Sequence, residues 1–198
     1  MKIIGITGGV GSGKSQVLSF VQKEYQGYVC EADRVAWDLQ NPGQSCYAQI
    51  VDIFGADVLN DDQTIDRKKL GGIVFANPEK LQRLNRIMHP EVKKAILKII
   101  GAEKEKGTTL FFLEAALFFE DSYDELCDEV WYIYTNEEIR RSRILSSRDY
   151  DDEKVTAIMK SQKSDAFFRE KSHRVIDNNG DFSQTILQIK EVVDKWEN

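Results

Sequence analysis

Short apolar runs alternate along the chain with longer segments whose apolar residues recur every three or four positions. Runs without a polar face are typical of buried parallel strands, and the periodic segments between them predict helices. The expected strands are Lys2–Thr7, Tyr28–Cys30, Thr109–Leu113, Val130–Tyr134 and Arg174–Ile176. Their alternation with helices predicts an α/β fold built on a parallel five-stranded sheet flanked by helices.

The stretch between the second and third predicted strands is about 75 residues long, far more than an ordinary crossover. Its apolar spacing and turn residues predict an inserted helical subdomain. The expected helices are Asp33–Leu39, Ser45–Phe54, Arg67–Val74, Pro78–Met88 and Pro90–Lys104.

A glycine-rich octapeptide, Gly8 to Ser15, follows the first predicted strand and precedes a predicted helix. It fits the pattern G-x-x-x-x-G-K-[ST] of the phosphate-binding P-loop. The backbone N–H groups of such a loop and the N-terminus of the helix form an anion site. The alternative is a glycine-rich turn that binds nothing. The loop, the lysine, the serine and the flanking strand and helix all agree with the motif, so we expect a nucleotide site.

The P-loop pattern predicts which residues contact ATP and Mg²⁺. Lys14 is expected to reach the β- and γ-phosphates, and the Ser15 hydroxyl is expected to hold Mg²⁺. The rest of the phosphate cradle is assigned to Gly11, Ser12, Gly13 and the backbone N–H of Gln16. The chain lacks the [NT]-K-x-D signature of guanine binding, which favours a kinase over a GTPase.

Two acidic residues stand at the ends of predicted strands, where open α/β sheets bind ligands. Asp33 could accept a proton from a substrate hydroxyl, or it could cap a helix that begins near Arg34; its position alone favours neither. Glu114 stands where P-loop proteins often keep an acid near Mg²⁺, and capping or ion pairing is the alternative.

A basic segment follows the fourth predicted strand. Arg140, Arg141, Arg143 and Arg148 lie on or beside one predicted helix. Such a segment can close over a triphosphate as a lid, whereas a solvated helix face paired with nearby acids is the alternative. We expect one or two of these arginines to contact ATP.

Composition excludes several classes of partner. The chain has 198 residues, 41% of them hydrophobic, and a net charge of −6, which argues against a nucleic-acid partner. No apolar run approaches the roughly 20 residues that span a bilayer, and no signal peptide precedes the first strand. We therefore expect no membrane contact and a cytoplasmic location. The three cysteines are expected to be reduced thiols. With only two histidines in the chain, a Cys/His zinc site is not expected.

Several motifs coincide with those of one enzyme family. Besides the P-loop, the chain has Glu31-Ala32-Asp33, Asp66-Arg67, His89-Pro90, Leu117-Phe118-Phe119-Glu120 and Ile176-Asp177-Asn178-Asn179-Gly180. In this combination the chain resembles the dephospho-coenzyme A kinases nearly end to end. One departure is Glu31, which replaces the first acid of the family's Asp-Ala-Asp motif.

The resemblance implies transfer of the γ-phosphoryl group of ATP to the ribose 3′-hydroxyl of dephospho-coenzyme A, the last step of coenzyme A synthesis. It makes Asp33 the catalytic base and implies acceptor contacts from Thr7, Arg67 and His89 together with Asp33. Lys14, Arg143 and Arg148 would be catalytic cations. Asn178 would lie near the adenine of ATP, mainly through its backbone.

The same resemblance implies three functional parts. A nucleotide-binding core would comprise residues 1–34, 105–135 and 172–198, a helical acceptor-binding insert 35–104, and a lid 136–171. Two rival functions remain open at this point. One is a P-loop kinase for a nucleoside, nucleotide or sugar, which the long insert disfavours; the other is a regulatory ATP-binding protein without turnover, which intact Lys14, Ser15 and Asp33 disfavour.

Overall fold

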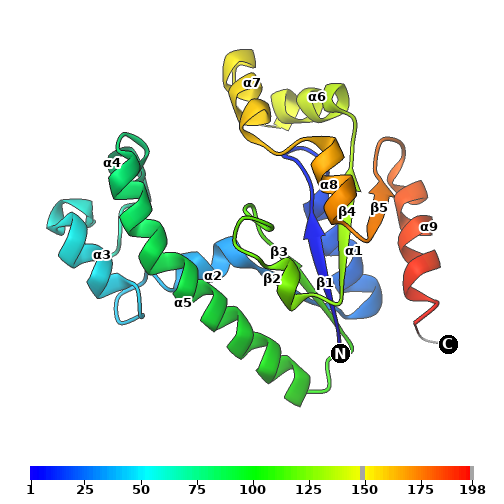
Figure 1. Ribbon diagram of the computed structural model, residues 1–198, viewed down its shortest axis with the longest axis horizontal. Coiled ribbons are helices and arrows are strands. Elements are labelled where there is room, and N and C mark those ends of the chain that lie inside the picture. Colours follow the sequence, from blue (N-terminus) through cyan, green and yellow to red (C-terminus); the bar gives the residue numbers. More distant parts are fainter. Residues whose placement is uncertain (148–149, 197–198) are drawn as a thin grey trace. The chain divides into compact units, whose positions relative to one another are not determined.

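The computed structural model describes residues 1–147 and 150–196. A single sheet runs through it in the order β2-β3-β1-β4-β5 (Figure 1). The pairs β1–β3, β1–β4 and β4–β5 are all parallel. The predicted five-stranded parallel sheet is therefore confirmed, with the strands β1 Lys2–Thr7, β2 Tyr28–Glu31, β3 Leu110–Glu114, β4 Glu129–Tyr134 and β5 Arg174–Asp177.

Only a short 3₁₀ turn separates β3 from β4, whereas each of the other four strands is followed by helices. They are α1 Lys14–Tyr25, α2 Ala32–Asp38, α3 Tyr47–Phe54, α4 Arg67–Phe75, α5 Pro78–Glu105, α6 Glu137–Ser147, α7 Asp152–Ser161, α8 Asp165–Lys171 and α9 Phe182–Val193, with the short 3₁₀ turns η1 Ala56–Val58 and η2 Asp124–Leu126. Within the described residues, no helix has the length and apolar character needed to cross a membrane.

The central strand is β1, whose neighbours come from much later in the chain. Lys2 pairs with Leu110 on β3, and Gly5 pairs with Val130 on β4. Because the pairings are parallel, the carboxyl ends of β1, β3, β4 and β5 lie at the same edge of the sheet. The P-loop begins at that edge, directly after Thr7.

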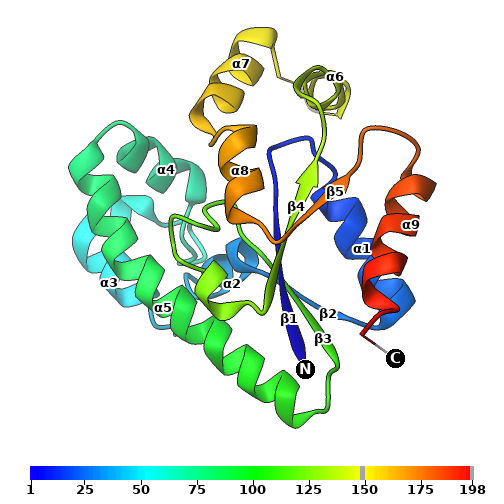
Figure 2. The same cartoon turned by 45° about the vertical axis from the view of Figure 1, so that its right-hand side comes forward.

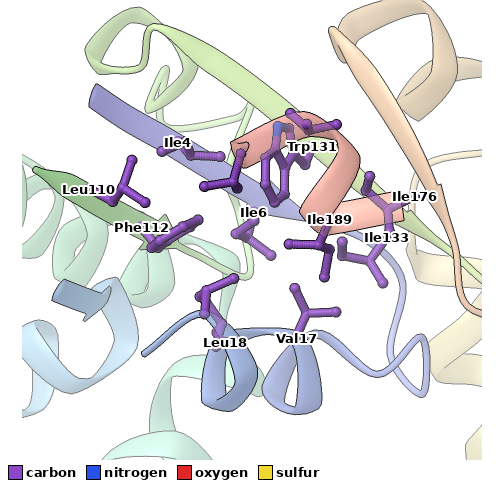
Figure 3. Packing of buried hydrophobic residues seen from close by; sticks show 13 residues of the cluster. Ile4, Ile6, Val17, Leu18, Leu110, Phe112, Trp131, Ile133, Ile176 and Ile189 are labelled. Atoms are coloured by element: carbon purple, nitrogen blue, oxygen red, sulfur yellow. The ribbon is translucent and has the colours of Figure 1, made fainter. Parts of the chain in front are cut away.

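The main hydrophobic core lies between one face of the sheet and the helices α1 and α9. Ile4 and Ile6 of β1 and Trp131 of β4 are fully buried there against Leu18 of α1 and Ile189 of α9 (Figure 3). This packing places the helix after the P-loop flat against the strand before it. The loop between them is thereby held at both ends.

The chain divides into two compact units. One holds Met1–Val29 and the chain from Thr108 onward, and the other holds Cys30–Gly107. In the second unit, α2, α3 and α4 all pack on the long helix α5 (Figure 2). Two of its helices begin with a side-chain cap: the side chain of Asp66 accepts from the first turn of α4, and that of Asn77 accepts from the first turn of α5. The acceptor-binding role of this segment stays a prediction.

The long helix α5 corrects one prediction. Two helices were expected on either side of His89, but one continuous helix contains Pro90 in its interior. An interior proline removes one backbone hydrogen bond and costs about 3 kcal/mol. Burial of an apolar side chain contributes about 1.5–3 kcal/mol, and α5 buries four around the proline, Ile87, Met88, Val92 and Ile96. Packing therefore outweighs the break that the local sequence favours.

A buried carboxylate joins three strands at the opposite, amino end of the sheet. Glu129 is 7% exposed and accepts hydrogen bonds from Trp131 Nε1, at 2.9 Å, and from Arg174, while Lys2 Nζ lies 3.4 Å away. Burial raises the pKa of the Glu129 carboxyl, but the hydrogen bonds from Trp131 and Arg174 outweigh burial, so this pKa lies below its usual value. The carboxylate thus links β1, β4 and β5.

We expect Glu129→Gln to lower the free energy of unfolding at pH 7 by about 1–3 kcal/mol, because hydrogen bonds to a charged group are lost. A carboxyl whose pKa is lowered on folding stabilises the folded state fully above its ordinary pKa of 4.5. This stabilisation is lost as the pH falls through the pKa of the folded state. Urea unfolding measures the free energy of unfolding of variant and parent at pH 7 and at about pH 3.5. The difference between the two proteins should be smaller at the lower pH. The control is Glu191→Gln, which removes an exposed ion pair with Lys195. A difference in unfolding free energy between Glu129→Gln and the parent that does not change with pH would contradict this account.

Candidate active site

The P-loop adopts backbone conformations that glycine alone adopts easily. Gly11 has φ of 80° and Gly13 has φ of 91°, both in the left-handed region. A Cβ at Gly11 would lie 2.8 Å from the carbonyl oxygen of Arg140, and a Cβ at Gly13 would collide with the side-chain amide of Asn178. Conformation and space therefore both require glycine at these two positions.

The middle of the loop is anchored through one backbone carbonyl. The Ser12 carbonyl oxygen lies 2.8 Å from the donor Asn178 Nδ2 and 3.0 Å from the Thr135 hydroxyl. The other end of the Asn178 amide accepts from the Thr185 hydroxyl at 2.8 Å. Asn178, Thr135 and Thr185 are each at most 2% exposed, so these bonds form out of water, where they are electrostatically stronger.

The buried hydroxyl of Ser12 has no hydrogen-bond partner within the part of the chain that the structure describes. Ser12 is 1% exposed, and leaving a buried polar group unpaired costs about 1–3 kcal/mol. A phosphate oxygen held in the loop would supply an acceptor. The loop therefore fits a phosphate by its glycine backbone and also by this side chain.

Lys14 rests against the start of its own loop. Its Nζ donates to the Gly8 carbonyl oxygen at 2.9 Å and lies 3.6 Å from Glu114 Oε1 at the end of β3. Among the residues that the structure describes, no side chain caps the N-terminus of α1, so its first turn keeps its positive dipole end for an anion. The Gln16 N–H donates to the Gly13 carbonyl at 3.0 Å, and its contact with phosphate stays a prediction. Ser15, one residue earlier, is exposed.

Two of the four predicted lid arginines lie beside the P-loop. Arg143 donates to the Asn178 carbonyl at 3.0 Å and lies 3.4 Å from the Thr135 hydroxyl. Arg140 donates to Gln162 Oε1 at 3.2 Å and lies 3.5 Å from the Val10 carbonyl.

The other two arginines are placed differently. Arg141 pairs with Asp152 of α7 and donates to Thr156 Oγ1 at 2.8 Å, which is the surface pairing offered as the alternative for this segment. Arg148 lies outside the described residues. The assignment of a phosphate contact to Arg148 stays a prediction.

Asp33, Arg67 and His89 all belong to the second compact unit, whereas Thr7 lies at the end of β1, 3% exposed. Asp33 is exposed in the first turn of α2, whose N-cap is Glu31. Asp33 is therefore not the cap of that helix, which removes the capping alternative. Arg67 lies 4.6 Å above the Trp37 ring at a pocket of about 460 Å³, and His89 is half-buried in α5.

Sequence reasoning assigned no role at the loop to three residues that position it. Thr135 and Thr185 support the Ser12 carbonyl, and Gln162 Oε1 accepts from the Val10 N–H at 3.1 Å. Thr135 follows β4 directly, so its position at the carboxyl edge of the sheet was a usable signal. Nothing local marks Thr185 or Gln162, since each acts through a partner more than six residues away.

The parallel sheet, the P-loop after its central strand and the arginines of α6 beside that loop define a P-loop kinase. A family model described as dephospho-CoA kinase matches residues 2–184. A dephospho-CoA kinase of Carboxydothermus hydrogenoformans is 38% identical over 99% of this chain and 95% of its own. The chain belongs to the dephospho-CoA kinase family.

Solved structures agree with this placement. A protein of Thermus thermophilus is similar with a TM-score of 0.83 and 25% identity, covering 98% of this chain and 97% of that one. A dephospho-CoA kinase from Campylobacter jejuni is similar with a TM-score of 0.73 and 26% identity, covering 97% of this chain and 98% of that one.

We expect Asn178→Ala to loosen the P-loop, because the Ser12 carbonyl loses its 2.8 Å donor and the Thr185 hydroxyl loses its acceptor. The free energy of unfolding should fall by about 1–3 kcal/mol, and KM for ATP should rise about tenfold, the equivalent of 1.4 kcal/mol. Thermal unfolding and steady-state kinetics measure the two effects.

The matched control is Asn179→Ala. Asn179 is the neighbour of Asn178 in the chain; it donates to Asp177 Oδ1 and accepts from the Asn136 N–H, and these side-chain hydrogen bonds lie outside the P-loop. Equal KM values for the two variants would show that the Asn178 anchor is unimportant for nucleotide binding.

Proposed function

We propose that this chain transfers the γ-phosphoryl group of ATP to the ribose 3′-hydroxyl of dephospho-coenzyme A, giving coenzyme A and ADP, the last step of coenzyme A synthesis. The observation that supports this most directly is a complete, anchored P-loop in a chain that matches the dephospho-CoA kinase family over residues 2–184. The rival kinases and the regulatory protein are disfavoured by that match.

In the proposed reaction, the loop N–H groups and Lys14 hold the triphosphate. Lys14 Nζ, which contacts the Gly8 carbonyl and Glu114 in the structure, exchanges these contacts for the β- and γ-phosphate oxygens. Arg143 and Arg140 stand on α6 beside the loop and add positive charge near the group in transfer.

Asp33 is proposed as the group that orients the acceptor. Its carboxylate accepts the proton of the 3′-hydroxyl while that oxygen bonds to the γ-phosphorus and the bond from the γ-phosphorus to the β-bridging oxygen breaks. Thr7, Arg67 and His89 are proposed to hold the rest of the acceptor. Catalysis is then mainly positioning and electrostatic stabilisation.

The residues at the loop also suit Mg²⁺, which takes oxygen ligands and keeps several waters and substrate phosphates in its shell. The Ser15 hydroxyl would hold the ion, and the Glu114 carboxylate is the nearby acid. No group of three or more His, Cys, Asp or Glu that could hold a metal occurs among residues 1–147 and 150–196, so the proposal gives most of the ligands to phosphate oxygens and water. When bound, the ion neutralises phosphate charge.

The direct test is ADP release from Mg-ATP with and without dephospho-coenzyme A, with the product mass determined. Acceptor-dependent ADP and a product one phosphate heavier are expected. Folded protein that binds ATP but gains nothing from dephospho-coenzyme A would refute the proposed acceptor, and a panel of nucleosides, nucleotides and sugars would then identify the substrate.

Asp33→Asn should lower kcat by roughly 10²–10⁴, because the base is lost while the size of the side chain is kept. ATP binding, measured by titration calorimetry, should stay close to that of the parent. Asp38→Asn, at the other end of the same helix α2, is the control. Unchanged turnover in Asp33→Asn would exclude Asp33 as the base.

Lys14→Ala should lose most activity, because the γ-phosphate loses its positioning cation; removal of a single stabilising group of this kind typically costs about 10²–10³ in kcat. Lys23→Ala, in the last turn of the same helix α1, controls for general effects of charge removal. Full activity of Lys14→Ala would contradict the P-loop assignment.

A further inference from the structure

Arg140 of α6 is held over the P-loop by neutral groups. Its Nη1 donates to Gln162 Oε1 at 3.2 Å and lies 3.5 Å from the Val10 carbonyl oxygen. Within residues 1–147 and 150–196, no carboxylate pairs with Arg140, whereas its neighbour Arg141 pairs with Asp152. Neutral acceptors fix a guanidinium without compensating its charge, so Arg140 keeps that charge and most of its five N–H donors for an anion.

Gln162 is the side chain that ties this arginine to the loop. Its Oε1 accepts from the Val10 N–H at 3.1 Å as well as from Arg140. Gln162 directly follows α7 and is half-buried. One side-chain oxygen therefore joins the backbone of the loop, the arginine of α6 and the end of α7.

Gly9 leaves the space in which the guanidinium lies. A Cβ at Gly9 would collide with Arg140 Nη1 and would lie 3.1 Å from Gln162 Oε1. Gly9 does not share the positive φ of Gly11 and Gly13, so space rather than backbone conformation calls for glycine here. The pattern G-x-x-x-x-G-K-[ST] leaves this position open. The approach of the arginine therefore explains a glycine that the motif does not require.

The guanidinium lies over the part of the loop that also contacts the lysine. Gly8, directly before Gly9 and Val10, accepts from Lys14 Nζ at 2.9 Å through its carbonyl oxygen. Lys14 is the group that reaches the β- and γ-phosphates in a P-loop. A cation fixed beside this segment is therefore well placed for the terminal phosphate of ATP.

We propose that Gln162 is a positioning residue that orients Arg140 toward the γ-phosphate of ATP. This inference rests on the proposed function, in which Arg140 adds positive charge near the group in transfer. Electrostatic stabilisation is most effective when the charges are in place before the reaction begins. A long side chain that is already fixed also loses less freedom when its ligand binds. Gln162 fixes Arg140 in this way before ATP arrives.

The first test uses Gln162→Met, because methionine keeps the length of glutamine and offers only a weak acceptor. ADP and a non-hydrolysable ATP analogue, each with Mg²⁺, are titrated by calorimetry. A hydrogen bond to a charged group is equivalent to a factor of roughly 10–150. We therefore expect the dissociation constant of the analogue to rise about tenfold more than that of ADP, which lacks the γ-phosphate. A loop that is merely loosened would bind both nucleotides more weakly by the same factor.

A double-mutant cycle identifies the residue through which Gln162 acts. Gln162→Met alone should lower kcat by about tenfold, but in an Arg140→Met background it should change kcat by less than about twofold, because contacting residues that act together are not additive. The matched control is the same cycle with Arg141→Met. Arg141 precedes a turn bonded to Asp152 and Thr156 rather than to Gln162, so Gln162→Met should keep its full effect there.

A second variant keeps the test valid if Gln162→Met folds poorly. Gly9→Ala leaves Gln162 intact, but its methyl group takes the space of the Arg140 guanidinium. It should therefore weaken binding of the ATP analogue more than binding of ADP, as Gln162→Met does. Gly101→Ala is the control, since a Cβ at Gly101 of α5 meets nothing within 4 Å.

Two outcomes would overturn the inference. One is a ratio of the two dissociation constants that stays at the parent value in both Gln162→Met and Gly9→Ala. The other is a loss of kcat in Gln162→Met that persists in full when Arg140 is already replaced. The nucleotide titrations need no acceptor, so they are independent of the proposed function, whose failure would appear as a parent protein that releases no ADP in response to dephospho-coenzyme A.

Discussion

The nucleotide site depends on the burial of one backbone carbonyl, that of Ser12. A loop with four glycines in eight residues has many conformations and loses much entropy when it is fixed. The Thr135 hydroxyl and the Asn178 amide reach this carbonyl from the ends of β4 and β5. Because they do so away from water, the loop is held open for phosphate before any ligand arrives, and the cost of ordering it is met during folding.

The same two residues also meet the helix that carries the arginines. Arg143 donates to the Asn178 carbonyl and approaches the Thr135 hydroxyl. Arg140 and Gln162 form a second link, to the backbone of Val10. The positions of α6 and of the end of α7 are thus tied to the loop at two points, directly at Val10 and, through Asn178 and Thr135, at Ser12.

The sequence was most informative where a structure is determined by nearby residues. The strands and the P-loop follow from runs of apolar residues and from a short motif, and the sheet has the predicted form. The single helix across Pro90 was not predicted, because burial of its neighbours outweighs a local preference. The roles of Thr185 and Gln162 were not predicted for a similar reason, since they depend on partners brought close only by the folded chain. Asp33 was already a candidate from its place at the end of a strand, whereas Arg67 and His89 could be proposed as site residues only through the family resemblance.

The order of strands in the sheet has a consequence for the synthesis of the protein. Lys2 of β1 pairs with Leu110, and Gly5 pairs with Val130, so the first strand to leave the ribosome must wait for partners made about a hundred residues later. At roughly 5–20 residues per second, that wait lasts about 5–20 s. The contiguous unit Cys30–Gly107 can form its helical contacts meanwhile, but β1 and its apolar residues stay unpaired. In the growing chain, the strand that leads into the phosphate loop is therefore the segment most in need of protection from aggregation.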